Sequence, residues 1–253
     1  MNSLIYTCYS NIGRLRKINQ DNYICAGSYL RESDEVSEIS LKKTTLKNKA
    51  VLLGVFDGLG GEECGEVASL IAAECASEFK FDDDTEASLK KYCELSNEKV
   101  CKYADDNNVD TMGTTAALLA FSKKNVVLCN QGDSKIFRLS GGKLEQLSVD
   151  HYGQAVFGQK PPLSQCLGIP AAEMIIEPYI KTYNYEDEDI FLICSDGLTD
   201  MVDSETIKEC LISNPFDKAS DMLLKKALDN GGKDNITLIL CKTKKSIFWR
   251  RAH

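Results

Sequence analysis

The sequence is poor in the residues that build zinc sites and disulfide frameworks. Only two of its 253 residues are His, and none of its 11 Cys stands in a CxxC pair. Zinc is held in proteins mainly by His and Cys, and small secreted folds depend on paired Cys. The odd number of Cys, several of them within apolar runs such as "FLICSDG", indicates buried thiols in a reducing cytoplasm.

Long apolar runs and an excess of positive charge are also missing. No uninterrupted apolar run approaches the roughly 20 residues of a transmembrane helix, and the opening "MNSLIYTCYS" is too short and polar for a signal peptide. The net charge of -8 disfavours a nucleic-acid-binding domain, which needs a basic face to neutralise phosphates. We therefore expect a soluble, cytoplasmic, monomeric protein that binds neither nucleic acid nor membrane.

The apolar runs that are present are mostly short, β-branched and bounded by turn residues, which predicts strands. We expect them at residues 4–9, 22–26, 50–56, 114–121, 126–130 and 135–139, after the hairpin turn Gly141-Gly142, before Pro178, and in "DIFLICS" and "NITLILCK". Helical spacing predicts helices near 67–79, 85–103, 204–211 and 216–228. Strands dominate the middle, with helices in pairs on either side, so the pattern favours two packed sheets covered by helices over a doubly wound parallel sheet.

Three finer predictions accompany this pattern. In the first helix the buried face is expected to comprise Val67, Leu70, Ile71, Cys75 and Phe79. The region 31–49 is polar and charged, so we expect a solvated loop or insertion there. Residues 1–243 are expected to form one domain, followed by a basic tail, 244–253, that holds the only Trp. A frayed tail is favoured over a membrane or partner contact.

The stretch "VLLGVFDGLGGEECGEVAS", which begins at Val51, combines a strand, a glycine-rich turn and a helix. This order resembles a dinucleotide-binding fingerprint, in which backbone N–H groups face a pyrophosphate. However, Asp57 precedes the glycines and Glu62, Glu63 and Glu66 follow them. A phosphate would meet carboxylates before it met amides, so the loop is better suited to attracting cations.

Four Asp residues stand at the ends of apolar strands, each next to a Gly or Asn. Any one of them is more often a turn former than a ligand, since Asp-Gly and Asp-Asn are common turn pairs. If the strands belong to two facing sheets, however, their ends can converge at one rim, where clustered carboxylates require cations. The four segments are "GVFDGLGG" with Asp57, "NQGDSK" with Asp133, "ICSDGLTD" with Asp196 and "GKDNITL" with Asp234.

The type of ligand limits the choice of cation. Carboxylates, backbone carbonyls and water suit Mg²⁺ or Mn²⁺. Two such ions a few Å apart can deprotonate a bridging water and stabilise an in-line displacement at phosphorus. The sequence therefore predicts phosphoester hydrolysis.

Six motifs in order extend this prediction to a known family. "RKINQDNY", "VFDGLGG", "MGTTAALLA", "NQGDSKIFRL", "CSDGLTD" and "KDNITLILC" resemble those of the metal-dependent protein phosphatases of the PPM or PP2C family, and most resemble its compact bacterial members. The resemblance covers residues 4–242. It implies an α+β fold, a four-layer α-β-β-α sandwich of two mainly antiparallel sheets flanked by helices, with a metal centre in a cleft at one end.

The resemblance also implies ligands for two metal ions and for a third, weaker position. Asp57 would bridge two ions, and Gly58 would offer its backbone carbonyl to one of them. The other ion would be held by Asp196 and Asp234. Asp21 would act through metal-bound water, and Asp133 with Asp196 would form the third position.

Arg16 aligns with the family's phosphate-binding Arg, five residues before Asp21. A bidentate pair with the phosphate would fix phosphorus for attack by the bridging hydroxide. Arg14 and Lys17 compete for this role. Four further residues are interpreted as structural supports around the site: Asn19, Gly113, Thr114 and Asn235.

The sequence departs from the family pattern in two places. Leu59 stands where eukaryotic members have a His that can protonate the leaving alkoxide, so a metal-bound water would be the acid. Between "VDHYGQ" and "PPLSQCLGIP" the chain has only "AVFGQK", where many relatives carry a longer helical flap. A shortened flap implies a more open cleft. We expect His151 to be structural.

These observations predict a Mn²⁺- or Mg²⁺-dependent phosphatase that acts on phosphoserine and phosphothreonine in proteins. One alternative is a pseudophosphatase that binds phosphoproteins without hydrolysing them. Another is a small-molecule phosphoesterase or nuclease, of which the net charge of -8 disfavours the nuclease. Expected partners are a bacterial Ser/Thr kinase and its substrates, or a phosphorylated regulator of a sigma-factor pathway.

Overall fold

The computed structural model describes residues 2–31, 36–47, 49–59, 64–154 and 161–245. The strands in this part of the chain pair antiparallel with their neighbours in two sheets. The strands are β1 (Ser3–Asn11), β2 (Asp21–Cys25), β3 (Val36–Thr45), β4 (Val51–Asp57), β5 (Ala116–Phe121), β6 (Val126–Gln131), β7 (Lys135–Ser140), β8 (Lys143–Gln146), β9 (Tyr179–Tyr183), β10 (Ile190–Cys194) and β11 (Ile236–Lys244). The helices are α1 (Gly65–Glu78), α2 (Thr85–Asn107), α3 (Asp196–Thr199), α4 (Ser204–Ser213) and α5 (Phe216–Asp229).

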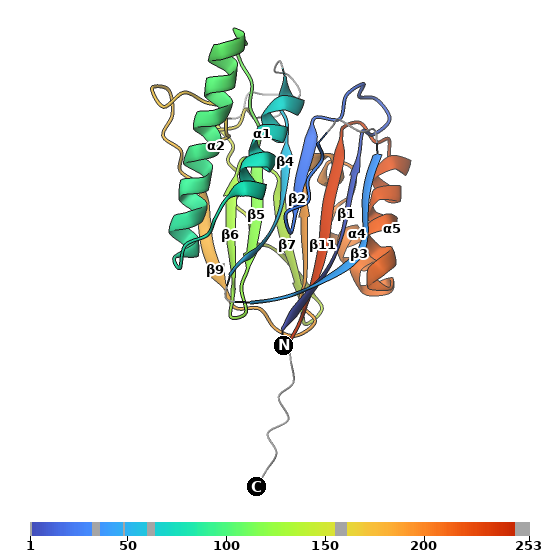
Figure 1. Cartoon of the computed structure of the whole chain (residues 1–253). Coiled ribbons are helices and arrows are strands. Elements are labelled where there is room, and N and C mark those ends of the chain that lie inside the picture. Colours follow the sequence, from blue (N-terminus) through green and yellow to red (C-terminus); the bar gives the residue numbers. More distant parts are fainter. Residues whose placement is uncertain (1, 32–35, 48, 60–63, 155–160, 246–253) are drawn as a thin grey trace.

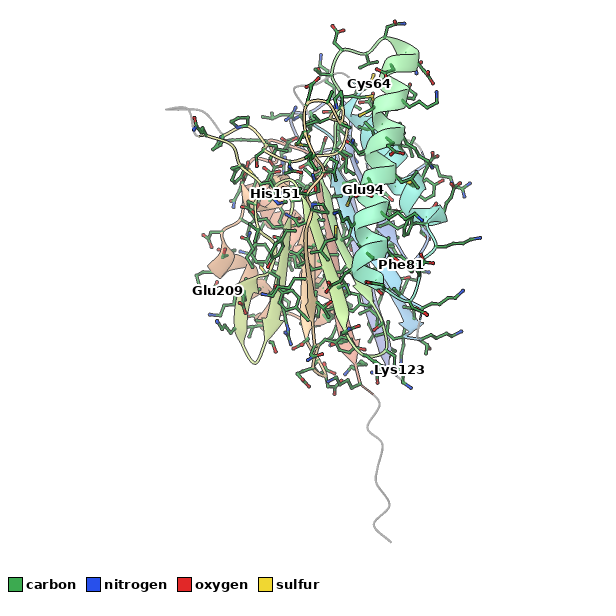
Figure 2. All side chains as sticks on the ribbon, turned by 90° about the vertical axis from the view of Figure 1, so that its left-hand side faces the viewer. Cys64, Phe81, Glu94, Lys123, His151 and Glu209 are labelled. Atoms are coloured by element: carbon green, nitrogen blue, oxygen red, sulfur yellow. The ribbon has the colours of Figure 1, made fainter. Side chains whose placement is uncertain are left out.

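The two sheets lie face to face and carry helices on their outer sides, so the expected four-layer sandwich is confirmed (Figure 1). One sheet has the order β3-β1-β11-β10-β7-β8, and the other has the order β2-β4-β5-β6-β9. Helices α1 and α2 cover the five-stranded sheet, whereas α4 and α5 cover the six-stranded sheet. Figure 2 shows α2 along the face of the five-stranded sheet, with Lys123 at the end of the sheets away from His151.

Three layers of buried side chains hold these elements together. The central layer, between the sheets, includes Leu53, Phe121 and Ile239. A second layer joins α1 and α2 to the five-stranded sheet, and a third joins α4 and α5 to the six-stranded sheet. Burial of apolar surface is the main favourable term in folding, and here it fixes the position of each strand end relative to the others.

Region 31–49 is not the loop that its polarity predicted. Residues Val36–Thr45 form β3, which pairs with β1 at the edge of the six-stranded sheet. Most β3 side chains are exposed, but Ile39 packs against the central core and the Ser37 hydroxyl lies 3.0 Å from that of Tyr23. An edge strand can be this polar because its neighbour supplies the backbone hydrogen bonds.

One further prediction about local structure was wrong, and another was correct only in part. The strand near Pro178 follows this residue as β9, because β9 pairs with β6 from Tyr179 onward. In α1 Cys75 is buried as expected, and Val67, Ile71 and Phe79 are half-buried and pack against buried clusters. The other deeply buried residues are mostly small ones, such as Ala68, Ala72 and Ala73. Small side chains let the helix backbone approach the sheet closely.

The remaining predicted elements are present, including the hairpin between β7 and β8. The short helix α3 was not predicted. In the described residues, no helix has both the length and the apolar character to cross a membrane. The expected tail begins at the last residue of β11, and residues 246–253 lie outside the described part of the chain.

Candidate metal centre

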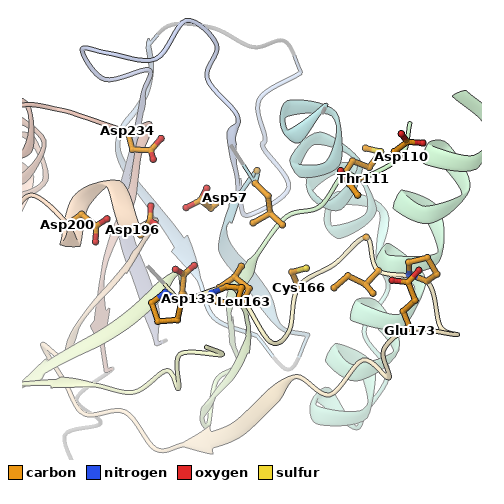
Figure 3. Close-up of a pocket in the computed structure, with 18 of the residues that line it drawn as sticks. Asp57, Asp110, Thr111, Asp133, Leu163, Cys166, Glu173, Asp196, Asp200 and Asp234 are labelled. Carbon is orange, nitrogen blue, oxygen red and sulfur yellow. The ribbon is translucent and has the colours of Figure 1, made fainter. Parts of the chain in front are cut away.

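The predicted site residues meet in one cleft at the end of the two sheets. The cleft has a volume of about 970 Å³ and extends from the ends of the strands toward α2 (Figure 3). Asp21 lies directly behind the cleft, opposite Asp57 in the pairing of β2 with β4. The predicted residues that line it are Arg16, Asp57, Gly58, Asp133, Asp196 and Asp234.

Both sheets contribute carboxylates to this cleft. Asp57 ends β4 of the five-stranded sheet, and Asp133 lies in the turn from β6 to β7, where the chain passes from one sheet to the other. Asp196 follows β10, and Asp234 precedes β11, which is the neighbour of β10 in the six-stranded sheet. The convergence of strand ends that the sequence predicted is therefore present.

Backbone contacts fix the segment that carries Asp57 and Gly58. The Asp57 N–H donates to Thr115 Oγ1 at 3.0 Å, and Thr114 Oγ1 donates to the Asp57 carbonyl at 3.0 Å. A Cβ atom at position 58 would collide with the carbonyl oxygens of Gly65 and Gln20. The close approach of three chain segments explains why glycine occupies this position.

The segments around Asp196 and Asp234 are packed equally closely. Asp196 begins α3, and a Cβ atom on Gly197 would collide with the Asn235 carbonyl oxygen. The Asn235 N–H donates to Asp234 Oδ1 at 2.8 Å. The two carboxylates are thus held on neighbouring, tightly packed backbones.

Asn235 also holds the Arg16 loop, which we define as residues 12–20. Its amide nitrogen donates to the carbonyls of Ile12 and Ile18 at 2.9 and 3.0 Å, and its amide oxygen accepts from the Gln20 N–H at 2.8 Å. The structural role expected for Asn235 is consistent with these three bonds. Through them the start of β11 determines where Arg16 lies.

The geometry favours Arg16 over its neighbours as the phosphate-binding residue. Arg16 lines the cleft, and its Nη2 donates to Asp234 Oδ2 at 2.6 Å. Arg14 instead points to the end of α5, where its Nε donates to the Leu228 carbonyl at 2.8 Å. Lys17 is not among the residues that line the cleft. A guanidinium has five N–H donors, so Arg16 can contact Asp234 and a phosphate together.

The charges of the cleft are strongly unbalanced. Among the described residues, its lining comprises seven acidic residues and one basic residue, Arg16. Desolvation and the charges of Asp21, Asp196, Asp133 and Asp234 raise the pKa of Asp57 well above its ordinary value. The neighbouring carboxylates thus disfavour one another's ionised forms, and cations would relieve this repulsion.

Asp21 is the most deeply buried of these acids, with 3% of its surface exposed. Burial raises its pKa to about 7, against the effect of hydrogen bonds from Ser195 and Thr237. The Ser195 hydroxyl donates to Asp21 Oδ2 at 2.8 Å and accepts from the Thr237 N–H at 3.0 Å. Ser195 therefore links Asp21 to the strands that carry Asp196 and Asp234.

The acidic end of the cleft fits a hard divalent cation. It offers carboxylate oxygens and the Gly58 carbonyl, which are the ligands that Mg²⁺ and Mn²⁺ prefer. In the described residues, no group of three His, Cys, Asp or Glu side chains lies close enough to hold one ion. Mg²⁺ commonly takes one or two carboxylates and several waters, so a set of three is not required. The roles of these residues as ligands remain predictions.

The structure brings in supporting residues that the sequence did not single out. Ser195 is completely buried beside Asp21, and Thr115 contacts both Asp57 and Ser134. Asp200, at the end of α3, lines the cleft together with Asp196. Ser195 and Asp200 both lie within the sequence motif "CSDGLTD". The motif therefore marked their position, but it indicated no role for either residue.

One of the two departures from the family pattern lies at the cleft. Leu59 lines it and carries no proton that it can donate. The Nδ1 of His151 accepts a hydrogen bond from the Gly132 N–H, and the backbone N–H of His151 donates to the Gly132 carbonyl. These bonds hold the turn before Asp133, as expected for a structural residue. The shortened flap, 155–160, lies outside the described residues, as do Glu62 and Glu63.

A family model for protein phosphatase 2C matches residues 27–236. The chain belongs to this family. The match spans Asp57, Asp133, Asp196 and Asp234, and begins after Arg16 and Asp21. The membership expected from the six motifs is thereby confirmed.

Two bacterial phosphatases are similar in sequence to this chain. The serine/threonine phosphatase stp of Listeria innocua is 30% identical over 217 residues, which cover 77% of this chain and 85% of that protein. The protein phosphatase PhpP of Streptococcus pneumoniae is 30% identical over 205 residues, which cover 73% and 82%.

A solved structure shares the fold. The catalytic domain of the serine/threonine protein phosphatase PstP, in complex with two manganese ions, superimposes with a TM-score of 0.76 at 25% identity. The match covers 97% of this chain and 100% of that domain. The two-sheet sandwich of this chain is therefore the protein phosphatase 2C fold.

Proposed function

We propose that this protein phosphatase 2C family member hydrolyses phosphoserine and phosphothreonine in proteins, using two divalent cations, Mn²⁺ or Mg²⁺. The observation that carries this proposal is the convergence of four strand-end carboxylates on one cleft beside Arg16. The pKa of Asp57 is raised there by burial and by the other acids. Such a cluster is suited to cations, and Arg16 is suited to a phosphate.

The position of each residue in the cleft suggests its role in metal binding. Asp57 lies centrally among the acids and would contact both ions, Gly58 would add its carbonyl, and Asp196 and Asp234 would hold the second ion. Asp21 would support the site from behind, and Asp133 would hold a third, weaker ion with Asp196. When bound, the ions supply Lewis acidity that activates water and offsets charge at phosphorus.

Arg16 would orient the phosphoryl group. Its guanidinium can form a bidentate pair with two phosphate oxygens, while the bond to Asp234 holds its position. Orientation of the reacting atoms reduces the entropic part of the barrier. Because Leu59 has no proton to donate, the leaving alkoxide would be protonated by water.

Substrates would be phosphorylated proteins. The relative from Listeria is named a serine/threonine phosphatase, and the relative from Streptococcus a protein phosphatase. For this chain, a bacterial Ser/Thr kinase with its targets and a phosphorylated regulator of a sigma-factor pathway both fit the proposed chemistry.

The test is hydrolysis of a phosphothreonine peptide by the metal-stripped protein, with Mn²⁺, Mg²⁺, Ca²⁺ or Zn²⁺ added back separately. We expect Mn²⁺ or Mg²⁺ to restore turnover, and Asp234→Asn to abolish most of it. Asp217→Asn is a matched control, because this exposed residue in the first turn of α5 does not line the cleft. A nucleotide and single-stranded DNA as substrates would distinguish a protein phosphatase from a general phosphoesterase.

Two outcomes would contradict the proposal. Measured Mn²⁺ binding without turnover of any substrate would indicate a phosphoprotein-binding module. Equal turnover by wild type and Asp234→Asn would show that Asp234 is not a ligand.

A further inference from the structure

The cleft extends well beyond the acidic end that would hold metal ions. From Asp57 it runs past Leu163 and Cys166 toward the C-terminal end of α2 (Figure 3). We call this extension the flanking groove. It is lined by Met112, Leu163, Cys166, Ile169, Pro170, Asp110 and Glu173, among others.

The flanking groove has a firmly held wall. Thr114 and Leu167 exchange two backbone hydrogen bonds of 2.9 Å. The buried Asn97 of α2 accepts from the Gly168 and Ile169 N–H groups at 2.7 and 3.1 Å and donates to the Ile169 carbonyl at 2.9 Å. The described part of the groove is thus preformed, which reduces the entropy lost when a ligand binds.

The far end of the groove is acidic. Asp110 follows the C-terminus of α2, and Glu173 lies in a turn in which its N–H donates to the Pro170 carbonyl at 2.9 Å. Figure 3 shows both acids on the side of the cleft away from Asp196 and Asp234. No basic side chain lines this end among the described residues, since Arg16 lies at the other.

The end of α2 adds to this negative potential. A helix C-terminus carries a partial negative charge and favours cations, yet the last turn of α2 has no basic residue and includes Asp105. Asp106, in the same turn, is paired with Lys102 at 2.6 Å and adds little to this potential. Burial and the charges of Asp105 and Glu173 raise the pKa of Cys101, so Glu173 lies close to the helix. This arrangement is unfavourable within the free protein and would be relieved by a cationic partner.

We propose that the flanking groove binds the residues next to the phosphoresidue of a protein substrate, and that Asp110 and Glu173 select substrates with Arg or Lys about three positions away. The inference rests on the proposed function. It is supported by the continuity of the groove with the proposed metal centre, by its apolar lining and by the complementary charge at its far end.

The spacing follows from the chain itself. The Leu59 N–H donates to the Gly113 carbonyl at 3.1 Å, which places Gly113 beside the Asp57-Gly58 segment. Asp110 is three residues before Gly113, and an extended chain spans roughly 3.3–3.6 Å per residue. A substrate peptide that runs along this wall therefore needs about three residues to reach Asp110.

The test uses phosphothreonine peptides in which a single Arg or Ala is placed at each position from four before to four after the phosphoresidue. With the metal-loaded full chain, we expect one position, about three residues before or after the phosphoresidue, to favour Arg. At this position kcat/KM should be about three- to tenfold higher for Arg than for Ala, which is the effect of one or two partly exposed ion pairs. The preference should appear mainly in KM. It should shrink at high salt, because exposed charges are screened.

Charge-neutral variants identify the residues responsible. In Asp110→Asn/Glu173→Gln, we expect the Arg-to-Ala ratio to fall close to one. The matched control is Asp217→Asn/Glu209→Gln, which removes the same charge from exposed positions on α5 and α4. It should keep the wild-type ratio.

The outcomes separate this inference from the proposed function. Hydrolysis of the peptides without any preference for Arg would overturn the inference alone, as would an unchanged ratio in Asp110→Asn/Glu173→Gln. An equal fall of the ratio in the control variant would assign the preference to net charge rather than to the groove. No hydrolysis of any peptide or of p-nitrophenyl phosphate with Mn²⁺ or Mg²⁺ would overturn both.

Discussion

Replacing Asn235 with Ala removes the side chain that holds the Arg16 loop against the start of β11. Three hydrogen bonds, to Ile12, Ile18 and Gln20, are lost from a residue that is 4% exposed. At about 1 kcal/mol for each net hydrogen bond, the free energy of unfolding should fall by about 3 kcal/mol. For a chain of this size that corresponds to a decrease in Tm of about 6–12 °C.

The activity of Asn235→Ala should decrease as well, even at a temperature where the variant is folded. Without the three bonds, the Arg16 loop would no longer hold Arg16 in place beside Asp234. The phosphate of the substrate should then be oriented less well, and KM should rise. The assays are urea unfolding followed by fluorescence or circular dichroism, and hydrolysis of a phosphothreonine peptide well below the Tm of the variant.

Two comparisons make this prediction refutable. Asn230→Ala removes one exposed bond of 2.7 Å, to the Met201 carbonyl, and should lower the free energy of unfolding by about 1 kcal/mol or less. Asn235→Asp keeps the acceptor for Gln20 but places a buried carboxylate oxygen against the carbonyls of Ile12 and Ile18, so it should be at least as unstable as Asn235→Ala. If Asn235→Ala unfolds within about 0.5 kcal/mol of wild type and keeps its KM, the loop is not held by this side chain.

Three further predictions concern charge, packing and phosphate binding. The pKa of Asp21 in the folded protein, about 7, lies above its value in the unfolded chain. The folded state therefore binds more protons between about pH 4 and 7, and the metal-free protein should lose stability as pH rises through this window. Thermal unfolding in the presence of a chelator should show a Tm that falls with pH, and a Tm that rises with pH would contradict the prediction. Gly197→Ala forces a methyl group into the Asn235 carbonyl and should lower the free energy of unfolding by about 2 kcal/mol or more, measured by urea unfolding; a neutral effect would show that α3 can shift. Arg16→Lys keeps the charge but not the bidentate geometry, so kcat/KM should fall by about ten- to a hundredfold; equal kinetics in steady-state assays would exclude the bidentate role.

Much of the fold and the core of the candidate site followed from local patterns and family motifs. Strand-end Asp residues were recognisable because apolar runs stop at them, and the order of the six motifs indicated the family. The prediction that Asp57, Asp133, Asp196 and Asp234 share a cleft needed only the assumption of two facing sheets, and the structure places them so. Their functions as ligands are still predictions.

What could not be predicted depends on contacts between distant parts of the chain. β3 forms because β1 supplies hydrogen bonds to a polar segment, which no local pattern reveals. The contact of Ser195 with Asp21 joins residues 174 positions apart, and its existence depends on how the two sheets are superimposed. In α1, the small residues Ala72 and Ala73 let the helix approach the sheet closely, whereas Val67 and Ile71 pack against a cluster that includes Val100 of α2.

The position of β11 has a consequence for protein synthesis. Among the strands of the described residues β11 comes last in the sequence, yet it lies between β1 and β10 in the middle of its sheet and begins just after Asp234. During translation β1 emerges from the ribosome long before β11. The place of β11 between β1 and β10 therefore stays unfilled until the end of the domain has emerged. Pairings of such long sequence separation also form slowly. A nascent or prematurely terminated chain would therefore be unable to remove phosphate from its targets, and activity would appear only with the complete domain.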